Sequence, residues 1–276
     1  MPELPEVETI RRSLLSLIKD KTIQKTEIFT DSVFCNHTDF TVTGFKVVDI
    51  RRRGKYLLFD LAKEKEKALL MIHLRMTGKL LYSDFADDVR KHTHVRLHFV
   101  PEIVDFNDIR RFGKVELLPY QSDLQHKSLL KLGPEPFSKE FSLSYFLKVC
   151  SKRPKTTIKQ LLLDQTVVAG LGNIYCDEVL FRIGIHPASL VGKIPKEKLT
   201  ALKESIAPLL TEAIGFRGTS FRDYVDGLGK KGEFQLHLKV YSRAKEKCYL
   251  CGSEIEKCKV AGRGTHFCPN CQTLYK

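Results

Sequence analysis

The chain has 276 residues, of which 42% are hydrophobic, and a formal net charge of +13 at pH 7. This length allows one large domain or two, and the excess of Lys and Arg indicates a polyanionic partner, nucleic acid first and an anionic membrane second. No apolar run approaches the roughly 20 residues of a membrane helix, and the first residues lack the basic-then-apolar layout of a signal peptide. We therefore expect neither a membrane span nor export.

The first predicted element is an amphipathic helix, in which apolar residues recur at helical spacing from Val7 onward. Pro5 suits the first helical position, because its missing N–H costs nothing there. Glu6 lies where the positive end of the helix dipole favours an acid. Helix-start chemistry thus accounts for these two residues. It does not account for Pro2 or Glu3, which precede the predicted helix.

The chain then changes from strands to helices. Up to about residue 130, short apolar or alternating runs predict strands: KYLLFDL, ALLMIHL and VRLHFV. The Pro/Gly-rich stretch at 132–141 predicts a domain boundary. Beyond it, helical patterns occur in SLSYFLKVCSK, IKQLLLDQ, NIYCDEVLFRIG and KEKLTALKESIAPLLTEAI.

A glycine pair separates the second and third of these helices. Gly170 and Gly172 predict a tight turn, and Asn173 is placed to cap the helix that follows. Two interpretations fit: a plain corner between helices, or a phosphate site at a helix N-terminus. The net charge favours the phosphate site.

A second glycine-rich stretch, GLGKKG at 227–232, matches the spacing of a dinucleotide-binding loop. That motif needs a strand before it and a helix after it, whereas FQLHLKVY follows here and predicts a strand. We therefore interpret residues 215–232 as a glycine-rich loop, either a connector or a lid over a substrate.

Four cysteines near the end of the chain form two C-x2-C pairs separated by sixteen residues, a spacing typical of a zinc site. The predicted ligands are Cys248, Cys251, Cys268 and Cys271. Four thiolates leave no open position on the ion, so the zinc is expected to be structural. Arg263 is predicted at the tip of the hairpin between the pairs. The remaining cysteines are expected to be inert thiols: Cys35, Cys150, Cys176 and Cys258.

Several motifs occur in one order along the chain: MPELPEVETIRR, RRRGKYLLFDL, HLRMTGKL, DIRRFG, LGPEP, LLLDQTVVAGLGNIYCDEVL, IHP and the terminal cysteine hairpin. Together they resemble the formamidopyrimidine-DNA glycosylases, bacterial enzymes that remove oxidised purines such as 8-oxoguanine from DNA. The resemblance runs nearly end to end. The related endonuclease VIII group shares the fold, but PELPEVE and LGPEP favour the purine-specific branch.

The resemblance implies an α+β protein of several parts: an N-terminal helix plus β-sandwich catalytic domain (1–131), a linker (132–141), a helical DNA-binding domain (142–240) with a helix–two-turns–helix and the lid loop near 215–232, and a zinc-finger hairpin (241–276). It also implies one structural Zn²⁺ and a monomer in the bacterial cytoplasm. The expected partner is double-stranded DNA containing an oxidised purine, bound across the cleft between the domains, and no membrane.

The resemblance also assigns catalytic residues. Once Met1 is removed, Pro2 presents a secondary amine that attacks the sugar C1′ as the base leaves. An α-amino group has a pKa of about 7.7–8.0, so a useful fraction is neutral at pH 7. The resulting iminium ion is an electron sink for later eliminations. Glu3 is implied as the acid–base residue. Lys55 is implied in base excision and β-elimination, although from its neighbours alone it would be one more cation in a basic turn. Arg263 is tied to flanking phosphates and δ-elimination.

A glycosylase takes its target nucleotide out of the base stack. The resemblance implies that Met76, Arg110 and Phe112 fill the gap in the duplex, whereas alone Met76 and Phe112 would be assigned to the core. The implied phosphate contacts, each of which alone would be an ordinary surface or capping residue, are His73, His92, Asn173, Arg263 and Arg153 or Lys155.

Two residues depart from the pattern of the family. Arg217 stands where paired glycines are common, and Gly264 stands where threonine is commoner. The expected reaction is hydrolysis of the N-glycosidic bond to an oxidised purine, followed by β,δ-elimination that leaves a one-nucleotide gap. The alternatives are an endonuclease VIII-like enzyme for oxidised pyrimidines and a non-catalytic binder of damaged DNA. Intact Pro2, Glu3 and Lys55 argue against the binder.

Overall fold

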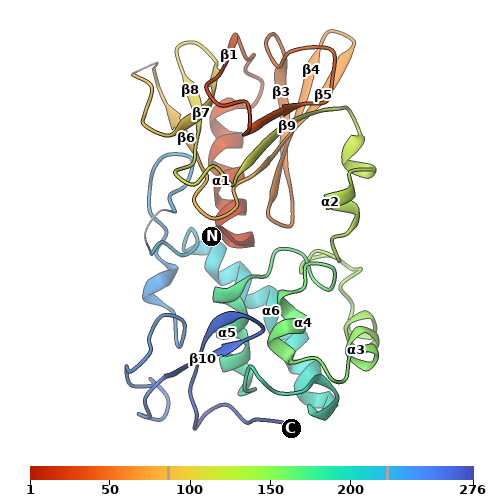
Figure 1. Cartoon of the computed structure of the whole chain (residues 1–276), viewed down its shortest axis with the longest axis vertical. Helices are drawn as coiled ribbons and strands as arrows, with labels where there is room; N and C mark the ends of the chain where they lie inside the picture. The colour runs from red at the N-terminus through yellow and green to blue at the C-terminus, as the bar shows by residue number, and fades with distance from the viewer. Residues whose placement is uncertain (86–87, 222–223) are drawn as a thin grey trace. The chain divides into compact units, whose positions relative to one another are not determined.

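The computed structural model describes residues 1–85, 88–221 and 224–276. The chain folds as two compact units, one of Met1–Leu130 with Ile214–Gln235 and one of Lys131–Ala213 with Leu236–Lys276 (Figure 1). Residues 222 and 223 of the predicted lid loop lie outside the described residues. No helix in the described ranges is long and apolar enough to cross a membrane.

Helix α1 (Leu4–Ile18) begins one residue before Pro5, the predicted first helical residue, because Glu3 is its N-cap. The backbone N–H of Glu3 donates to Glu6 Oε2 at 2.8 Å, and the Glu3 carboxylate accepts from the backbone N–H of Glu6. This is a capping box, which satisfies two N–H groups that helix geometry leaves unpaired. Glu3 precedes the first helical residue, as expected, but helix-start chemistry accounts for it after all, and Pro5 occupies the second helical position.

Two sheets form the rest of the first unit. The four-stranded sheet has the order β1-β7-β8-β6 and the five-stranded sheet the order β2-β9-β5-β4-β3, with only the β2–β9 pair parallel among the described pairs. The strands are β1 (Lys25–Ile28), β2 (Phe34–Asn36), β3 (Lys46–Arg53), β4 (Tyr56–Lys63), β5 (Glu66–His73), β6 (Lys79–Ser83), β7 (Thr93–His98), β8 (Ile103–Asn107) and β9 (Lys114–Pro119). A 3-10 turn η1 (Ser122–Leu124) and helix α2 (Lys127–Leu130) follow. The three strands predicted from apolar runs are confirmed as β4, β5 and β7.

One apolar core joins α1 to both sheets. The buried face of α1 consists of Val7, Ile10, Leu14 and Ile18, all at most 1% exposed, and this face packs with residues of β3, β4, β5, β7, β8 and β9. Each fully buried side chain of this kind stabilises the fold by about 1.5–3 kcal/mol. The predicted helix plus β-sandwich is confirmed, and its core fixes the α1 N-terminus against the sheets.

The second unit is helical, as predicted. Its helices and turns are α3 (Leu143–Lys152), α4 (Ile158–Leu163), α5 (Asn173–Ile183), η2 (Val191–Lys193) and most of α6 (Lys196–Gly215), followed by η3 (Phe234–Leu236) at its border and the hairpin of β10 (Glu256–Val260) and β11 (Arg263–Phe267). The hydroxyls of Ser142 and Thr157 cap α3 and α4. The helix pair α4–α5 with its intervening turns confirms the predicted helix–two-turns–helix.

Two local predictions in this unit were wrong. The N-cap of α5 is Gly172, and Asn173 is the first helical residue, so its side chain is available for another contact. The stretch FQLHLKVY forms no strand but the short turn η3 and an irregular segment. The cause is the buried carboxylate of Glu178, which accepts hydrogen bonds from the backbone N–H groups of Lys239, Val240 and Tyr241 at 2.8–2.9 Å. A sheet ladder would need these same donors.

Candidate functional site

The first group of predicted site residues lies at the start of α1. Pro2 is buried, and Glu3 and Glu6 are 2% and 1% exposed. Glu6 bonds the Glu3 N–H through Oε2 and the backbone N–H of Thr219 through Oε1, at 2.8 and 2.7 Å. A side chain at Gly218, which has φ +78°, would place its Cβ 2.7 Å from Glu6 Oε1. One carboxylate therefore joins the predicted nucleophile segment to the glycine-rich loop.

Lys55 lies in the turn between β3 and β4 and is 8% exposed. Its positive charge is close enough to His73 to disfavour protonation of the imidazole ring. Burial, with the positive charges of Arg75 and Lys55, lowers the pKa of His73 to about 3. His73 is thus neutral, and its Nδ1 accepts the backbone N–H of Arg75 at 2.9 Å. The proton of the neutral ring then lies on Nε2, so His73 offers one N–H donor, in a ring oriented by edge contact with Tyr56.

The depressed pKa of His73 predicts acid sensitivity. Unfolded His73 binds a proton near pH 6.5 and folded His73 only near 3, so the free energy of unfolding rises with pH between these values and is level above 6.5. When the pH falls from about 7.5 to about 5.5, the free energy of unfolding of the wild type should decrease by roughly 1.4 kcal/mol more than that of His73→Gln. Urea unfolding at both pH values measures this, and parallel losses in the two proteins would contradict a neutral His73.

The structure brings the three predicted wedge residues together. Met76 and Phe112 are 44% and 50% exposed, unlike core residues. The Arg110 guanidinium donates to Met76 Sδ at 3.2 Å and lies 4.5 Å from the centroid of the Phe112 ring. Two apolar side chains and one planar cation thus project as a cluster from the loops after β5 and β8.

A residue that the motif analysis missed holds these two loops together. The carboxylate of Asp108, fully buried, accepts from the Thr77 hydroxyl, from the backbone N–H of Arg110 at 3.1 Å and from the backbone N–H of Gly113 at 2.8 Å. Its backbone N–H donates to the His92 carbonyl at 3.0 Å. Asp108 therefore positions the loops of Met76, Arg110 and Phe112, and its place in DIRRFG was the available signal.

Replacement of Asp108 by Ala should leave several buried hydrogen-bond donors in the two loops without an acceptor. Each buried donor left without a partner costs about 1–3 kcal/mol, so we expect the free energy of unfolding to fall by about 2–4 kcal/mol. Denaturant titration measures this, with Asp31→Ala, an exposed aspartate of the same unit, expected within about 0.5 kcal/mol of wild type. Equal stabilities of the two variants would refute the anchoring role.

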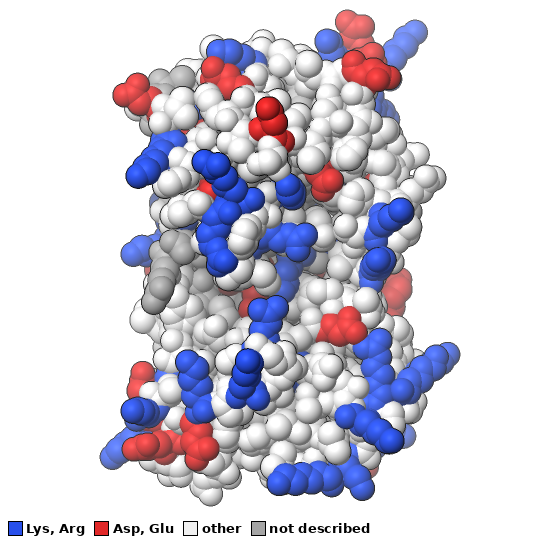
Figure 2. Space-filling model, viewed as in Figure 1, with Lys and Arg blue, Asp and Glu red and all other residues white. Residues whose placement is uncertain are grey.

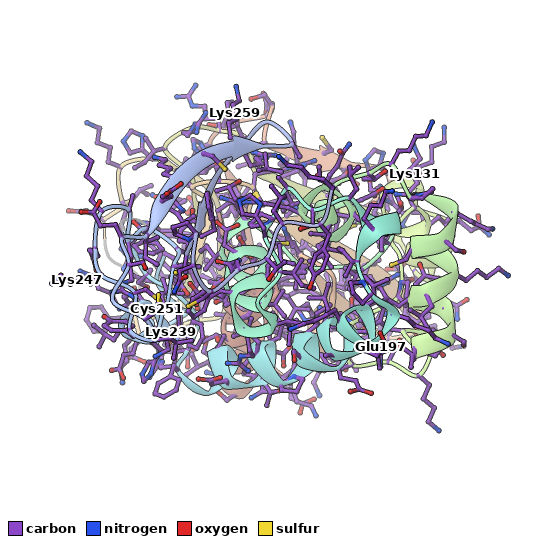
Figure 3. All side chains as sticks on the ribbon, turned by 90° about the horizontal axis from the view of Figure 1, so that it is seen from below. Lys131, Glu197, Lys239, Lys247, Cys251 and Lys259 are labelled. Atoms are coloured by element: carbon purple, nitrogen blue, oxygen red, sulfur yellow. The ribbon has the colours of Figure 1, made fainter. Side chains whose placement is uncertain are left out.

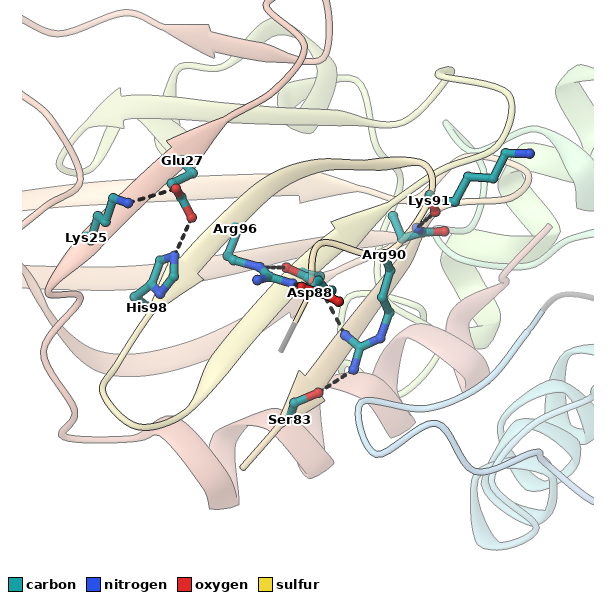
Figure 4. A network of polar contacts seen from close by, with 10 residues as sticks. Lys25, Glu27, Ser83, Asp88, Arg90, Lys91, Arg96 and His98 are labelled. Atoms are coloured by element: carbon teal, nitrogen blue, oxygen red, sulfur yellow. Dashed lines mark hydrogen bonds and ion pairs between the residues drawn. The ribbon is translucent and has the colours of Figure 1, made fainter. Parts of the chain in front are cut away.

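The turn that carries His92 is anchored to the four-stranded sheet through Arg90, which belongs to the polar network drawn in Figure 4. The buried Asp105 carboxylate accepts from Arg96 at 2.7 and 2.9 Å and from Arg90 at 3.1 Å, and Arg90 also donates to Ser83. His92, two residues after Arg90, has φ +69°, a left-handed backbone conformation that residues other than glycine rarely adopt. Arg90 and the Asp108 bond thus fix the turn from both sides, and the partly exposed His92 side chain is presented from it.

In the second unit, two predicted cations share one open pocket of about 610 Å³. Arg153 lies after α3 and Arg263 begins β11, directly after the turn at 261–262. Arg153 is held by Asp164 at 2.5 Å, whereas the Arg263 side chain has no ion-pair partner among the described residues. Lys155 is exposed and does not line the pocket. Its lining residues are Arg153, Thr156, Gln160, Leu163, Asp164, Ala261 and Arg263.

The hairpin that carries Arg263 is fastened to α4 and α5 through its backbone. Asn173 Nδ2 donates to the Gly264 carbonyl at 2.9 Å, while its buried Oδ1 has no hydrogen-bond partner in the described part of the chain. Lys159, fully buried, donates to Asp177 at 2.6 Å, to the Thr265 hydroxyl at 2.8 Å and to the Gly264 carbonyl at 3.4 Å. Sequence reasoning missed Lys159, whose signal was a lone cation on an apolar helix. Asn173 and Lys159 contact the carbonyl of Gly264, a group that does not depend on the side chain at this position.

The four predicted zinc ligands converge. Their sulfur atoms all lie within 4.8 Å of one another, with Cys251–Cys268 at 3.5 Å and Cys248–Cys271 at 3.9 Å. A tetrahedral Zn²⁺ with Zn–S bonds of about 2.3 Å requires sulfur separations of about 3.8 Å, so the donor set fits one structural zinc. Figure 3 labels Cys251 of this cluster, and Lys259 marks the hairpin strand β10.

Two cysteines outside this cluster, Cys150 and Cys258, have thiols with a raised pKa. Burial raises the pKa of Cys150 to about 12, and burial also raises the pKa of Cys258 on β10. A thiol with a raised pKa holds less reactive thiolate at neutral pH. The structure therefore supports the expectation of inert thiols at these two positions.

Known proteins resemble this chain along its whole length. Family models described as Formamidopyrimidine-DNA glycosylase N-terminal domain, Formamidopyrimidine-DNA glycosylase H2TH domain, and zinc finger found in FPG and IleRS match residues 1–115, 132–225 and 245–274. A formamidopyrimidine-DNA glycosylase of Lactobacillus helveticus is 45% identical over 100% of both chains.

Two solved structures of Lactococcus lactis FPG have the same fold. One is a variant in complex with a Fapy-dG containing DNA, with a TM-score of 0.89 and 40% identity, covering 99% of this chain and 100% of that one. The other is the wild type in complex with an oxidised pyrimidine containing DNA, with a TM-score of 0.87 and 39% identity over the same shares.

Proposed function

Because the chain belongs to the formamidopyrimidine-DNA glycosylase family, whose members are DNA glycosylases acting on damaged DNA, we propose that it excises oxidised purines from duplex DNA and then cleaves the strand. The observation that carries this proposal is the arrangement around Glu6, which joins Pro2–Glu3, at the start of α1, to the glycine-rich loop. The proposed substrates are 8-oxoguanine and formamidopyrimidines.

In the proposed reaction, the Pro2 nitrogen attacks the deoxyribose C1′ and the C1′–base bond breaks. The base leaves with the electron pair of that bond and is protonated, and the attacking nitrogen loses its own proton. The neutral amine supplies the electron pair, so Met1 must be absent, because its peptide bond would occupy that pair. Glu3 protonates the sugar ring oxygen as the ring opens, which yields an iminium ion. A secondary amine forms an iminium that cannot lose an N–H proton, and this cation draws electrons through the β- and δ-eliminations.

Burial suits Glu3 and Lys55 to these roles. Both are at most 8% exposed, and charges that act in a site shielded from water interact more strongly than in bulk solvent. Lys55 supplies positive charge close to His73, and neutral His73 presents Nε2–H to a phosphate oxygen. The Lys55 role in excision rests on the family resemblance together with this position.

Extrusion of the lesion is assigned to the cluster of Met76, Arg110 and Phe112. Apolar wedges partly unstack a base step, and a guanidinium can hydrogen-bond the base left without its partner. Their shared exposure and mutual contacts suit insertion as one unit. His92 adds a proposed phosphate contact from the neighbouring turn.

Phosphate binding by the second unit is assigned to Arg153, Asn173 and Arg263, with Lys155 as an exposed outer contact. The Asn173 Nδ2 has a second hydrogen, besides the one donated to the Gly264 carbonyl, that it can donate to a phosphate, and the pocket lined by Arg153 and Arg263 can accept a phosphate oxygen. Basic side chains predominate over each unit on the face shown in Figure 2.

The affinity for DNA should fall steeply as salt rises, because a protein of charge +13 that contacts several phosphates releases counterions. Asn173→Ala should weaken binding to lesion and undamaged duplexes alike, since a phosphate contact carries no base information. Fluorescence titration at several salt concentrations measures both effects. A loss confined to one lesion would show that Asn173 does not contact phosphate.

A second candidate is excision of oxidised pyrimidines, favoured by the Lactococcus lactis FPG structure with an oxidised pyrimidine containing DNA. The deciding experiment uses duplexes that differ only in the lesion: 8-oxoguanine, a formamidopyrimidine or an oxidised pyrimidine. We expect faster excision of the purine lesions, and strand ends that carry phosphate on both sides of a one-nucleotide gap. Faster excision of the pyrimidine lesion, or a β-elimination end alone, would overturn the respective part of the proposal.

A further inference from the structure

The glycine-rich loop contains an ion pair at the position where the sequence departs from its family. Arg217 donates to Asp226 Oδ2, and Asp226 is fully buried. A buried carboxylate without a countercharge is strongly unfavourable, so this loop conformation depends on the guanidinium. The pair joins the start of the loop to its far turn.

Asp226 also organises that turn. Its Oδ1 accepts the backbone N–H groups of Leu228 and Lys230 at 3.0 and 2.9 Å, and its own N–H donates to the Lys230 carbonyl. The carbonyl of the next residue, Gly227, accepts a hydrogen bond from the Tyr82 N–H, and the Gly227 N–H donates to the Ser13 hydroxyl oxygen. The turn is therefore fixed to β6 and α1 of the same unit.

Arg217 has a conformation that needs outside support. Its φ is +62°, a left-handed value that costs a non-glycine residue free energy, and glycine would adopt it without strain. The hydroxyl of Tyr224, 9% exposed, donates to the Arg217 carbonyl at 3.0 Å. The side chain is held by Asp226 and the backbone by Tyr224, so both ends of this residue are fixed.

The two residues that follow Arg217 contact the proposed reaction centre through Glu6. Gly218 lies against the Glu6 carboxylate, and the Thr219 N–H donates to it. Glu6 in turn holds Glu3. The backbone between Arg217 and Thr219 is too short to adjust freely, so the ion pair and the Glu6 bond favour one another.

We propose that Arg217 is a positioning residue: through Asp226 it pre-forms the described parts of the glycine-rich loop, residues 215–221 and 224–232, before DNA binds. In this proposal the loop contacts the extruded lesion, and its fixed conformation narrows the range of lesions accepted. This inference rests on the proposed function. A rigid pocket rejects a base that does not fit it, whereas a mobile loop can adapt its contacts to several bases at an entropic cost. Loss of the pair should therefore relax discrimination between purine and pyrimidine lesions.

The test combines amide hydrogen exchange with excision rates. Arg217→Gln keeps the backbone demand of a non-glycine residue and removes only the charge. In the protein without DNA, we expect exchange of the Thr219 amide to accelerate ten- to hundredfold, the range of a hydrogen bond to a charged group. Asp226→Asn should act likewise, and the double variant should exceed neither single variant by much, because the two residues act as one pair.

Excision of each lesion by the same variants supplies the functional half. We expect the ratio of kcat/KM for 8-oxoguanine to that for an oxidised pyrimidine to fall about tenfold in Arg217→Gln, and Arg217→Lys to restore much of it. Arg182→Gln, which removes an exposed arginine–glutamate pair in the second unit, is the matched control and should change neither measurement.

The outcomes separate this inference from the proposed function. A wild-type Thr219 amide that exchanges at the rate of an unstructured chain would overturn the inference whatever the enzyme excises. A changed lesion ratio with unchanged exchange would also overturn it, because Arg217 would then contact the lesion directly. Faster exchange of the Thr219 amide in Arg217→Gln, with an unchanged ratio of kcat/KM between the two lesions, would overturn the proposed role of Arg217 in lesion specificity. Failure of the wild type to excise any lesion would instead contradict the proposed function.

Discussion

Sodium borohydride should link the protein, freed of Met1, covalently to duplex DNA carrying 8-oxoguanine through the nitrogen of Pro2. The linkage follows from the proposed iminium ion, which borohydride reduces to a stable amine. An unperturbed α-amino group has a pKa of about 7.7–8.0, so part of such a group is neutral at neutral pH and able to attack. Mass spectrometry of the linked peptide identifies the residue.

The form that retains Met1 is the matched control. It has the same sequence and charge in every folded element, yet its Pro2 nitrogen belongs to a peptide bond and has no electron pair to donate. We expect complete loss of trapping in this form. Linkage of the processed protein to Lys55 or another lysine, or none at all, would show that Pro2 is not the nucleophile.

The zinc site and the main elements could be predicted because their signals are local. Two C-x2-C pairs define the ligands by spacing alone, and the structure brings all four sulfurs together. The helices α3, α4, α5 and α6 follow from the spacing of apolar residues. The start of α1 was harder to predict, since Glu3 caps through a box with Glu6, and glutamate is not among the preferred capping residues.

The supporting contacts of the site could not be predicted because they join distant parts of the chain. Glu6 and Thr219 are 213 positions apart. Lys159 reaches Thr265 across 106 positions. The same reason explains the wrong strand at FQLHLKVY, where the carboxylate of Glu178 takes the backbone donors that a neighbouring strand would need. A side chain from another helix thus outweighed a local pattern.

Loss of the zinc and loss of the arginine it supports should have different consequences. Among the described residues, the apolar cluster beside the zinc ligands has five buried members, two of which are ligands themselves: Phe181, Val240, Cys248, Ile255 and Cys268. So small a core cannot order the hairpin without the metal. Cys268→Ser should therefore lose zinc, disorder the hairpin and abolish DNA binding, as metal analysis and titration would show.

Arg263→Ala should keep both zinc and fold, because the hairpin is held through the Gly264 carbonyl by Asn173 and Lys159 rather than through Arg263. A charge-assisted phosphate hydrogen bond is worth roughly 1.5–3 kcal/mol, so lesion DNA should bind about ten- to a hundredfold more weakly. Lys259→Ala removes one exposed cation from the same hairpin without touching the pocket, and should weaken binding by about threefold or less. If Cys268→Ser binds normally, or Arg263→Ala behaves like Lys259→Ala, then the zinc does not serve to position Arg263.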